Sequence, residues 1–140
     1  DVPLILDLME GLYLLEKEKI IVLEGPAKTN VSFEKLRRRA RRLYDEFDLK
    51  YAVYKDLREN GLIVTPGIKY GCDFAVYKHG PGVEHAPYMV SVKKMKDEVT
   101  ATEVVKAGRL ATTVRKRFII AIPGMEAKQI QYLIFKWFKA

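Results

Sequence analysis

The fold is decided by residues 51–92, which read YAVYKDLRENGLIVTPGIKYGCDFAVYKHGPGVEHAPYMVSV. A helical pattern near 50–59 ends before Gly61, a residue suited to the C′ position of a helix. The pattern then changes to β-branched and aromatic residues bounded by Pro and Gly, which is typical of strands joined by turns. The predicted elements are a strand over 62–64, a turn at Pro66–Gly67, a strand over 68–78, a break over 79–82 and a strand over 87–92. The stretch therefore predicts one helix followed by hairpin-connected strands.

The flanking segments add helices and strands on both sides. Before this stretch, apolar residues recur at three- and four-residue steps over 4–16, which predicts a helix, and a β-branched run over 20–23 predicts a short strand. After it, Thr100 and Glu103 have the spacing of a capping box, which predicts a helix to about residue 114. The last predicted strands cover 118–122 and 130–138.

An Arg-rich segment predicts a second helix before the deciding stretch. Ser32 can cap this helix, and Glu34 lies in its first turn. Its predicted buried stripe is Phe33, Leu36, Ala40, Leu43, Tyr44 and Phe47. The other side carries Arg37, Arg38, Arg39, Arg41 and Arg42. This cluster is consistent either with phosphate contacts or with a solvated charged face.

Together these elements predict a fold of the α/β class in which α and β elements are mixed (α+β). A small helical N-terminal part is expected over 1–48. The larger part, 49–140, is expected to hold a mixed, largely antiparallel sheet flanked by helices.

Composition excludes several classes of protein. No apolar run in the 140 residues approaches the roughly 18 needed to span a bilayer. The single cysteine, Cys72, excludes an internal disulfide framework and Cys-based zinc sites, and suggests a reducing cytoplasm. No signal peptide is visible, and the first residue, Asp1, leaves open that others precede it. The net charge of +7 favours a polyanion partner, although a basic protein from a warm habitat is the alternative.

Common catalytic motifs are absent. GPGVEH lacks the G-K-[ST] ending of a phosphate-binding loop, and neither HExxH nor GxSxG occurs. Asp73 leaves a metal-dependent nuclease open as an alternative, but CDFAVYK offers only Lys78 close behind it.

The turn around Pro81 places two reactive side chain types opposite each other. Reflecting the chain about Pro81 puts Tyr77 across from His85, where cross-strand Cβ atoms lie roughly 5 Å apart. Such a pair could serve as a general acid and base. The alternative is two polar-tipped residues that merely flank a turn, and His79 is a competing histidine at the turn itself. Lys116, in the basic run over 115–117 after the last predicted helix, is the candidate cation for this site.

The residues also carry a family resemblance. The deciding stretch, 51–92, and GRLATTVRKRFIIAI (108–122) resemble the catalytic domain of the archaeal tRNA-intron splicing endonuclease. The helix over 4–16 with KEKIIVLEG (17–25) resembles the end of that family's N-terminal domain. A tRNA-endonuclease-like catalytic domain is therefore expected over 49–140.

The resemblance implies a catalytic site that uses neither metal nor cofactor. It assigns the family's tyrosine, histidine and lysine to Tyr77, His85 and Lys116. It also implies that a bulged base is held between flat side chains, for which Arg109 and Trp137 are the candidates, with Arg115 as a further RNA-binding cation. Burial or a subunit contact is the alternative for Trp137.

The implied function is excision of introns from precursor tRNA at bulge–helix–bulge sites. The substrate's own 2′-hydroxyl attacks the phosphate and leaves a 2′,3′-cyclic phosphate and a 5′-hydroxyl. The alternatives are a non-catalytic RNA-binding or structural subunit of the same complex, and the metal-dependent nuclease that would use Asp73.

Two departures from the family pattern bear on assembly. The loop PGMEAKQ (123–129) holds only one acid, Glu126, where homomeric members carry an acidic docking loop. The chain also holds one catalytic half rather than two fused ones. We therefore expect a hetero-oligomer with a structural subunit, with a homo-oligomer left open, and no membrane partner.

Overall fold

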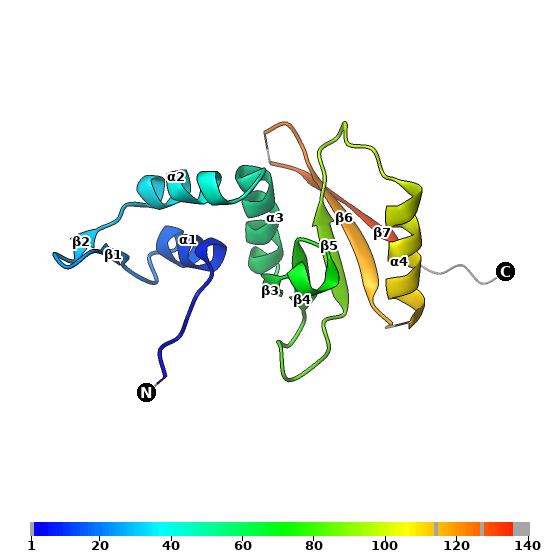
Figure 1. The fold of residues 1–140 in the computed structure, drawn as a ribbon, viewed down its shortest axis with the longest axis horizontal. Helices are drawn as coiled ribbons and strands as arrows, with labels where there is room; N and C mark the ends of the chain where they lie inside the picture. The colour runs from blue at the N-terminus through cyan, green and yellow to red at the C-terminus, as the bar shows by residue number, and fades with distance from the viewer. Residues whose placement is uncertain (1, 114, 127, 136–140) are drawn as a thin grey trace. The chain divides into compact units, whose positions relative to one another are not determined.

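The computed structural model describes residues 2–113, 115–126 and 128–135. The chain divides into two compact units, Asp1–Tyr51 and Ala52–Ala140. The division falls inside the helix α3 (Phe47–Glu59), which is labelled with the other elements in Figure 1. Within the described ranges, no helix is long and apolar enough to cross a membrane.

The first unit is mainly helical. Its elements are α1 (Leu8–Glu16), β1 (Leu23–Glu24), β2 (Thr29–Asn30), α2 (Phe33–Leu43) and the start of α3. The helix predicted from residue 4 begins only at Leu8, because the Asp7 carboxylate accepts the backbone N–H groups of Met9 (2.7 Å) and Glu10 (3.0 Å) and so caps it there. The strand predicted over 20–23 is shorter and later in the chain, since only Leu23 and Glu24 pair with β2.

The predicted cap of α2 is confirmed. The Ser32 hydroxyl accepts the backbone N–H of Lys35 at 3.3 Å, and Leu36 and Ala40 are buried as expected. The predicted burial of Leu43 is wrong, because its exposed fraction is 74%. It is the last residue of α2, where a helical face no longer dictates what packs against it.

The second unit is built on a five-stranded sheet. Its strands are β3 (Ile63–Pro66), β4 (Phe74–Tyr77), β5 (Tyr88–Val92), β6 (Arg117–Pro123) and β7 (Ile130–Phe135), in the order β3-β4-β5-β6-β7. All neighbours are antiparallel except β5 and β6, which are parallel and are connected by the crossover helix α4 (Ala101–Thr113). The mixed, largely antiparallel sheet with flanking helices is as predicted.

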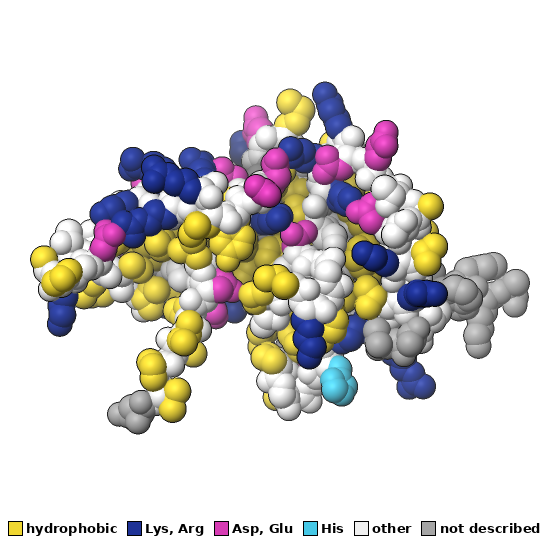
Figure 2. All heavy atoms as spheres, in the orientation of Figure 1, with side chains coloured by type: hydrophobic (Ala, Val, Ile, Leu, Met, Phe, Trp, Pro, Cys, Tyr) yellow, Lys and Arg dark blue, Asp and Glu magenta, His cyan; other side chains and the backbone are white. Residues whose placement is uncertain are grey.

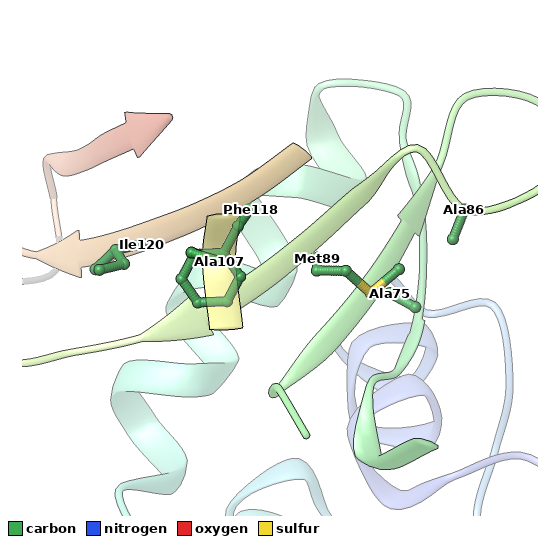
Figure 3. Packing of buried hydrophobic residues seen from close by; sticks show 6 residues of the cluster. All are labelled: Ala75, Ala86, Met89, Ala107, Phe118 and Ile120. Atoms are coloured by element: carbon green, nitrogen blue, oxygen red, sulfur yellow. The ribbon is translucent and has the colours of Figure 1, made fainter. Parts of the chain in front are cut away.

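The two faces of this sheet are covered by different helices. Toward α4 lies the buried cluster of Figure 3, formed by Ala75, Ala86, Met89, Ala107, Phe118 and Ile120. On α3, the Tyr54 ring packs against Phe74, and the Asp56 carboxylate accepts the Tyr132 hydroxyl of β7 at 2.6 Å. The second unit is thus layered as helix, sheet and helix.

The long strand predicted over 68–78 is interrupted. Residues Ile68–Tyr70 form a short 3₁₀ helix, η1, and β4 starts only at Phe74. Gly71, with φ +68°, ends η1 in a left-handed conformation that a strand does not contain. The part of the last predicted strand beyond residue 135 lies outside the described residues.

Candidate active site

Tyr77 is the last residue of β4. Its side chain is half-buried and packs against the cluster that faces α4, as does that of Tyr70. The neighbouring strand β3 pairs Ile63 with Tyr77, which fixes the end of β4 within the sheet. The Tyr77 phenol is therefore carried by a regular strand and lies at its C-terminal end.

His85 lies in the loop before β5 and is exposed. The predicted pairing of Tyr77 with His85 is wrong by two residues. The ladder pairs Val76 with Tyr88, so its continuation brings Tyr77 opposite Pro87. The turn is not symmetric about its middle, because the backbone N–H groups of residues 83 and 84 both point back to the carbonyl of residue 80. This error shifts the pairing register by two residues. A shift of two, unlike a shift of one, leaves every side chain on the same face of the sheet.

A carboxylate links the His85 loop to the end of β4. Glu84 accepts the backbone N–H of Lys78 and that of His79, the latter at 2.5 Å. These bonds, led by that from His79, lower the pKa of Glu84. The residue before His85 is thereby tied to the residue after Tyr77, which holds the two segments near each other. The competing histidine, His79, has an exposed side chain, as expected for a turn residue.

Lys116 brings a cation to the same loop. Its exposed fraction is 8%, and its Nζ donates to the Ala86 carbonyl at 2.8 Å. The same Nζ lies 4.9 Å from the centre of the Tyr70 ring, within cation–π range. The next residue, Arg117, donates its backbone N–H to the Pro87 carbonyl at 2.8 Å. The start of β6 is therefore bonded to the segment that follows His85.

The predicted RNA-binding residues are placed only in part. Arg109 on α4 and Arg115 after it are both exposed. Arg115 has φ +51°, and it turns the chain from α4 into β6. Within the described part of the chain, neither guanidinium takes part in a hydrogen bond or ion pair. Trp137 lies outside the described residues.

Asp73, the candidate of the metal-dependent alternative, has a structural role. Its carboxylate accepts the backbone N–H of Val92 at 2.7 Å, across the start of β4 and the end of β5. Among the residues that the structure describes, no three His, Cys, Asp or Glu side chains come together as a metal site would require.

Sequence reasoning missed two residues of this region, Tyr70 and Glu84. Glu84 could have been noticed, because an acid just after a Gly-rich turn often caps its backbone N–H groups. Tyr70 gave no such signal, since its contact with Lys116 joins segments 46 positions apart.

Comparison with known proteins identifies the class as an endonuclease of tRNA splicing. The model of the tRNA intron endonuclease catalytic C-terminal domain matches residues 47–132, and that of the family's N-terminal domain matches residues 1–37. The chain is 49% identical to a tRNA-splicing endonuclease of Hyperthermus butylicus, over 99% of this chain and 76% of that protein. The tRNA-splicing endonucleases of Saccharolobus islandicus and Sulfurisphaera tokodaii are 42% and 40% identical, over 98% and 97% of this chain and 75% and 74% of theirs.

The chain therefore belongs to the tRNA intron endonuclease family, as its resemblance predicted. It is an enzyme that cleaves tRNA introns. The alternative of a non-catalytic subunit is not favoured by the match to the catalytic domain.

Proposed function

We propose that this chain cleaves precursor tRNA at bulge–helix–bulge sites by metal-independent transesterification. The 2′-hydroxyl of the substrate attacks the adjacent phosphorus while the bond to the 5′-oxygen breaks. The products are a 2′,3′-cyclic phosphate and a 5′-hydroxyl. Tyr77 takes the proton from the 2′-oxygen, His85 protonates the departing 5′-oxygen, and Lys116 stabilises the charge of the pentacoordinate phosphorane.

The observation that carries this proposal is the buried ammonium of Lys116. It donates a hydrogen bond to the carbonyl of Ala86, which is the residue after His85. Glu84, the residue before His85, accepts the backbone N–H groups of the two residues that follow Tyr77. A buried cation is costly unless it is compensated, so its placement calls for a reason other than stability. Stabilisation of the negative charge on a phosphorane would explain the burial of this cation, because fixed cations are most effective where water is excluded.

Substrate choice follows from the same chemistry. The attacking 2′-hydroxyl is absent from DNA, so DNA is not cleaved. Unstacked bases of a bulge can be held by flat side chains, and the exposed guanidiniums of Arg109 and Arg115 are available for this contact. Trp137 completes this set as a second stacking residue.

We further propose that the working enzyme is a hetero-oligomer with a structural subunit in the cytoplasm. In the described part of the loop over 123–129, the Glu126 carboxylate pairs with Lys128 at 2.8 Å, so its one acid is already neutralised. An acidic docking loop must then come from a partner. At the edge of the sheet, β7 exposes about half of Leu133 and Ile134, as suits a subunit contact. The single cysteine is in keeping with a reducing compartment.

The test is cleavage of a bulge–helix–bulge RNA in excess EDTA by the assembled enzyme, with end-group analysis of the products. We expect Tyr77→Phe and His85→Ala each to lose at least about 10²-fold in single-turnover rate while RNA binding is kept. The matched controls are Tyr88→Phe in β5 and His79→Ala at the turn, which should cleave at nearly the wild-type rate. Dependence on added Mg²⁺, or full activity of either site variant, contradicts the proposal.

A further inference from the structure

The cations of α2 fall into groups according to their partners. On one side of the helix, Lys35 and Arg39 share the Glu24 carboxylate, with Lys35 Nζ at 2.8 Å from it. On the other side, the Nε atoms of Arg37 and Arg41 bind the two oxygens of Asp48, at 3.0 and 2.8 Å. Two acids therefore serve four cations, and each acid bridges a pair spaced four residues apart.

Arg38 and Arg42 form the remaining pair. A helix turns by about 100° per residue, so both point away from the buried stripe of Leu36 and Ala40, between the two paired flanks. Both are exposed. Within the part of the first unit that the structure describes, neither guanidinium has an ion pair or hydrogen bond. Figure 2 shows the Lys and Arg side chains gathered over α2.

The stability of the helix does not explain this pair. Like charges four residues apart destabilise a helix by about 0.2–0.5 kcal/mol. Arg42, in the last turn, gains from the helix dipole, but Arg38 in the middle does not. Because the flanking arginines each have an acid and this pair has none, an external anion is the natural partner.

We infer that Arg38 and Arg42 form a phosphate-binding site for the RNA substrate. Their Cα atoms are about 6 Å apart along the helix axis, so two guanidiniums can bind neighbouring phosphates of one strand. Guanidinium binds phosphate through paired N–H donors, which favours Arg over Lys for this contact. Contacts of this kind position the RNA and carry no base information. The inference rests on the proposed function for its ligand, and it assigns the first unit a direct part in substrate binding.

The test compares two double variants of equal charge change. Arg38→Gln/Arg42→Gln removes the outward pair, and the control Arg37→Gln/Arg41→Gln removes the pair bonded to Asp48. The dissociation constant for a bulge–helix–bulge RNA is measured from low to high salt. If both phosphate contacts are lost, the slope of log affinity against log salt falls by roughly 1.4–1.8 in magnitude. The control should change this slope by less than half as much, although it should unfold more easily.

Cleavage at saturating enzyme separates this inference from the catalytic proposal. We expect Arg38→Gln/Arg42→Gln to keep the wild-type single-turnover rate once the RNA is bound. A slope equal to that of the wild type overturns the inference, and so does an equal loss in both double variants, which would be an effect of net charge. If the slope is unchanged but light scattering shows a different mass for the assembled complex, the pair contacts an acidic protein partner. That outcome would also overturn the inference. Metal dependence of cleavage would contradict the catalytic proposal and leave the slope measurement intact.

Discussion

Lys116 is the residue whose environment most needs a functional explanation. Among the described residues it is the one charged side chain that is buried, and its ammonium has a carbonyl and an aromatic ring as partners rather than a carboxylate. A carboxylate would neutralise the cation and repel a phosphate. A neutral carbonyl and a ring hold the ammonium in place while they preserve its charge for a substrate.

This reading predicts that Tyr70 positions Lys116. Tyr70→Leu removes the ring and should slow single-turnover cleavage by about 2- to 30-fold, the range of a cation–π contact of about 0.5–2 kcal/mol. Tyr70→Phe keeps the ring and should restore nearly the full rate. The RNA concentration that gives half the maximal rate should change little in both variants.

Thermal unfolding of both variants provides the control for this prediction. If Tyr70 serves only to fill space against the core, the loss of rate will follow the loss of stability and Phe will give no selective rescue. Equal slowing by Phe and Leu would therefore contradict a positioning role.

At this scale the sequence predicted residue types better than their contacts. The types at Tyr77, His85 and Lys116 could be chosen from the sequence and the resemblance, and their roles stay a prediction. The partner of Lys116 could not be predicted, because it is the backbone carbonyl of Ala86 and every residue has such a group. The Tyr77–His85 register was wrong because pairing depends on how the turn is built, and hydrogen bonds within the turn make it asymmetric.

At the scale of elements, the loop from β3 to β4 controls where Tyr70 lies. Gly67 precedes η1, and a Cβ at this position would lie 2.6 Å from Cys72 Sγ and 2.8 Å from the Cys72 carbonyl oxygen. We expect Gly67→Ala to lower the free energy of unfolding by about 1–3 kcal/mol, as overpacking does. Denaturant titration followed by circular dichroism measures this change.

The matched variant is Gly11→Ala in α1, where a Cβ would meet nothing within 4 Å. Alanine is favoured over glycine inside a helix, so this change should raise the free energy of unfolding by about 0.5–1 kcal/mol. A loss of stability in both variants would mean that space around the Cβ is not what distinguishes the two sites.

The start of α4 predicts a pH dependence. Glu103 binds Lys93 Nζ and accepts the Thr100 backbone N–H at 2.8 Å, and these bonds lower its pKa from 4.5 to about 2. A lowered pKa in the folded state gives stability that is full above pH 4.5 and is lost as the pH falls toward 2. Glu103→Gln should therefore unfold at a lower temperature than the wild type at pH 7, with the difference fading over that window.

The control for this pH dependence is Glu98→Gln, an exposed carboxylate close to the same helix. Its melting temperature should follow that of the wild type at every pH. The assignment fails if the difference between Glu103→Gln and the wild type is as large at the acid end of the window as at pH 7.

Helix ends were the most predictable features at this scale. Ser32, the Thr100–Glu103 box and Gly61, which has φ +79°, all lie where the sequence placed them. Each acts on backbone groups within a few residues, so the local sequence is enough. The strand predicted over 68–78 failed for the opposite reason: Tyr70 packs against the core from a short helix, a contact that the local sequence does not distinguish from one made by a strand.

At the scale of the whole molecule, the sequence predicted two parts and a mixed sheet, because burial patterns extend over many residues. The boundary placed at 48/49 stays a prediction, and the division found by contacts lies at 51/52, inside α3. Assembly is less accessible from one sequence, because each interface is specified by two surfaces and a single chain contributes one of them. The charge of the loop over 123–129 is the part of this information that the chain does contain.

That loop predicts how the enzyme assembles. Its Glu126–Lys128 pair is exposed at both side chains, so it adds little to stability, but it cancels the negative charge with which a docking loop would bind a basic surface. In light scattering we expect the chain alone to be no larger than a dimer and to leave bulge–helix–bulge RNA uncut. Addition of a structural subunit with an acidic loop should produce a larger complex and cleavage.

Changing this loop instead, with Lys128→Glu and Gln129→Glu, should drive self-assembly that disappears at high salt, because attraction between exposed charges is screened. A stable and active homotetramer of the unmodified chain would mean that contacts other than this loop hold the enzyme together.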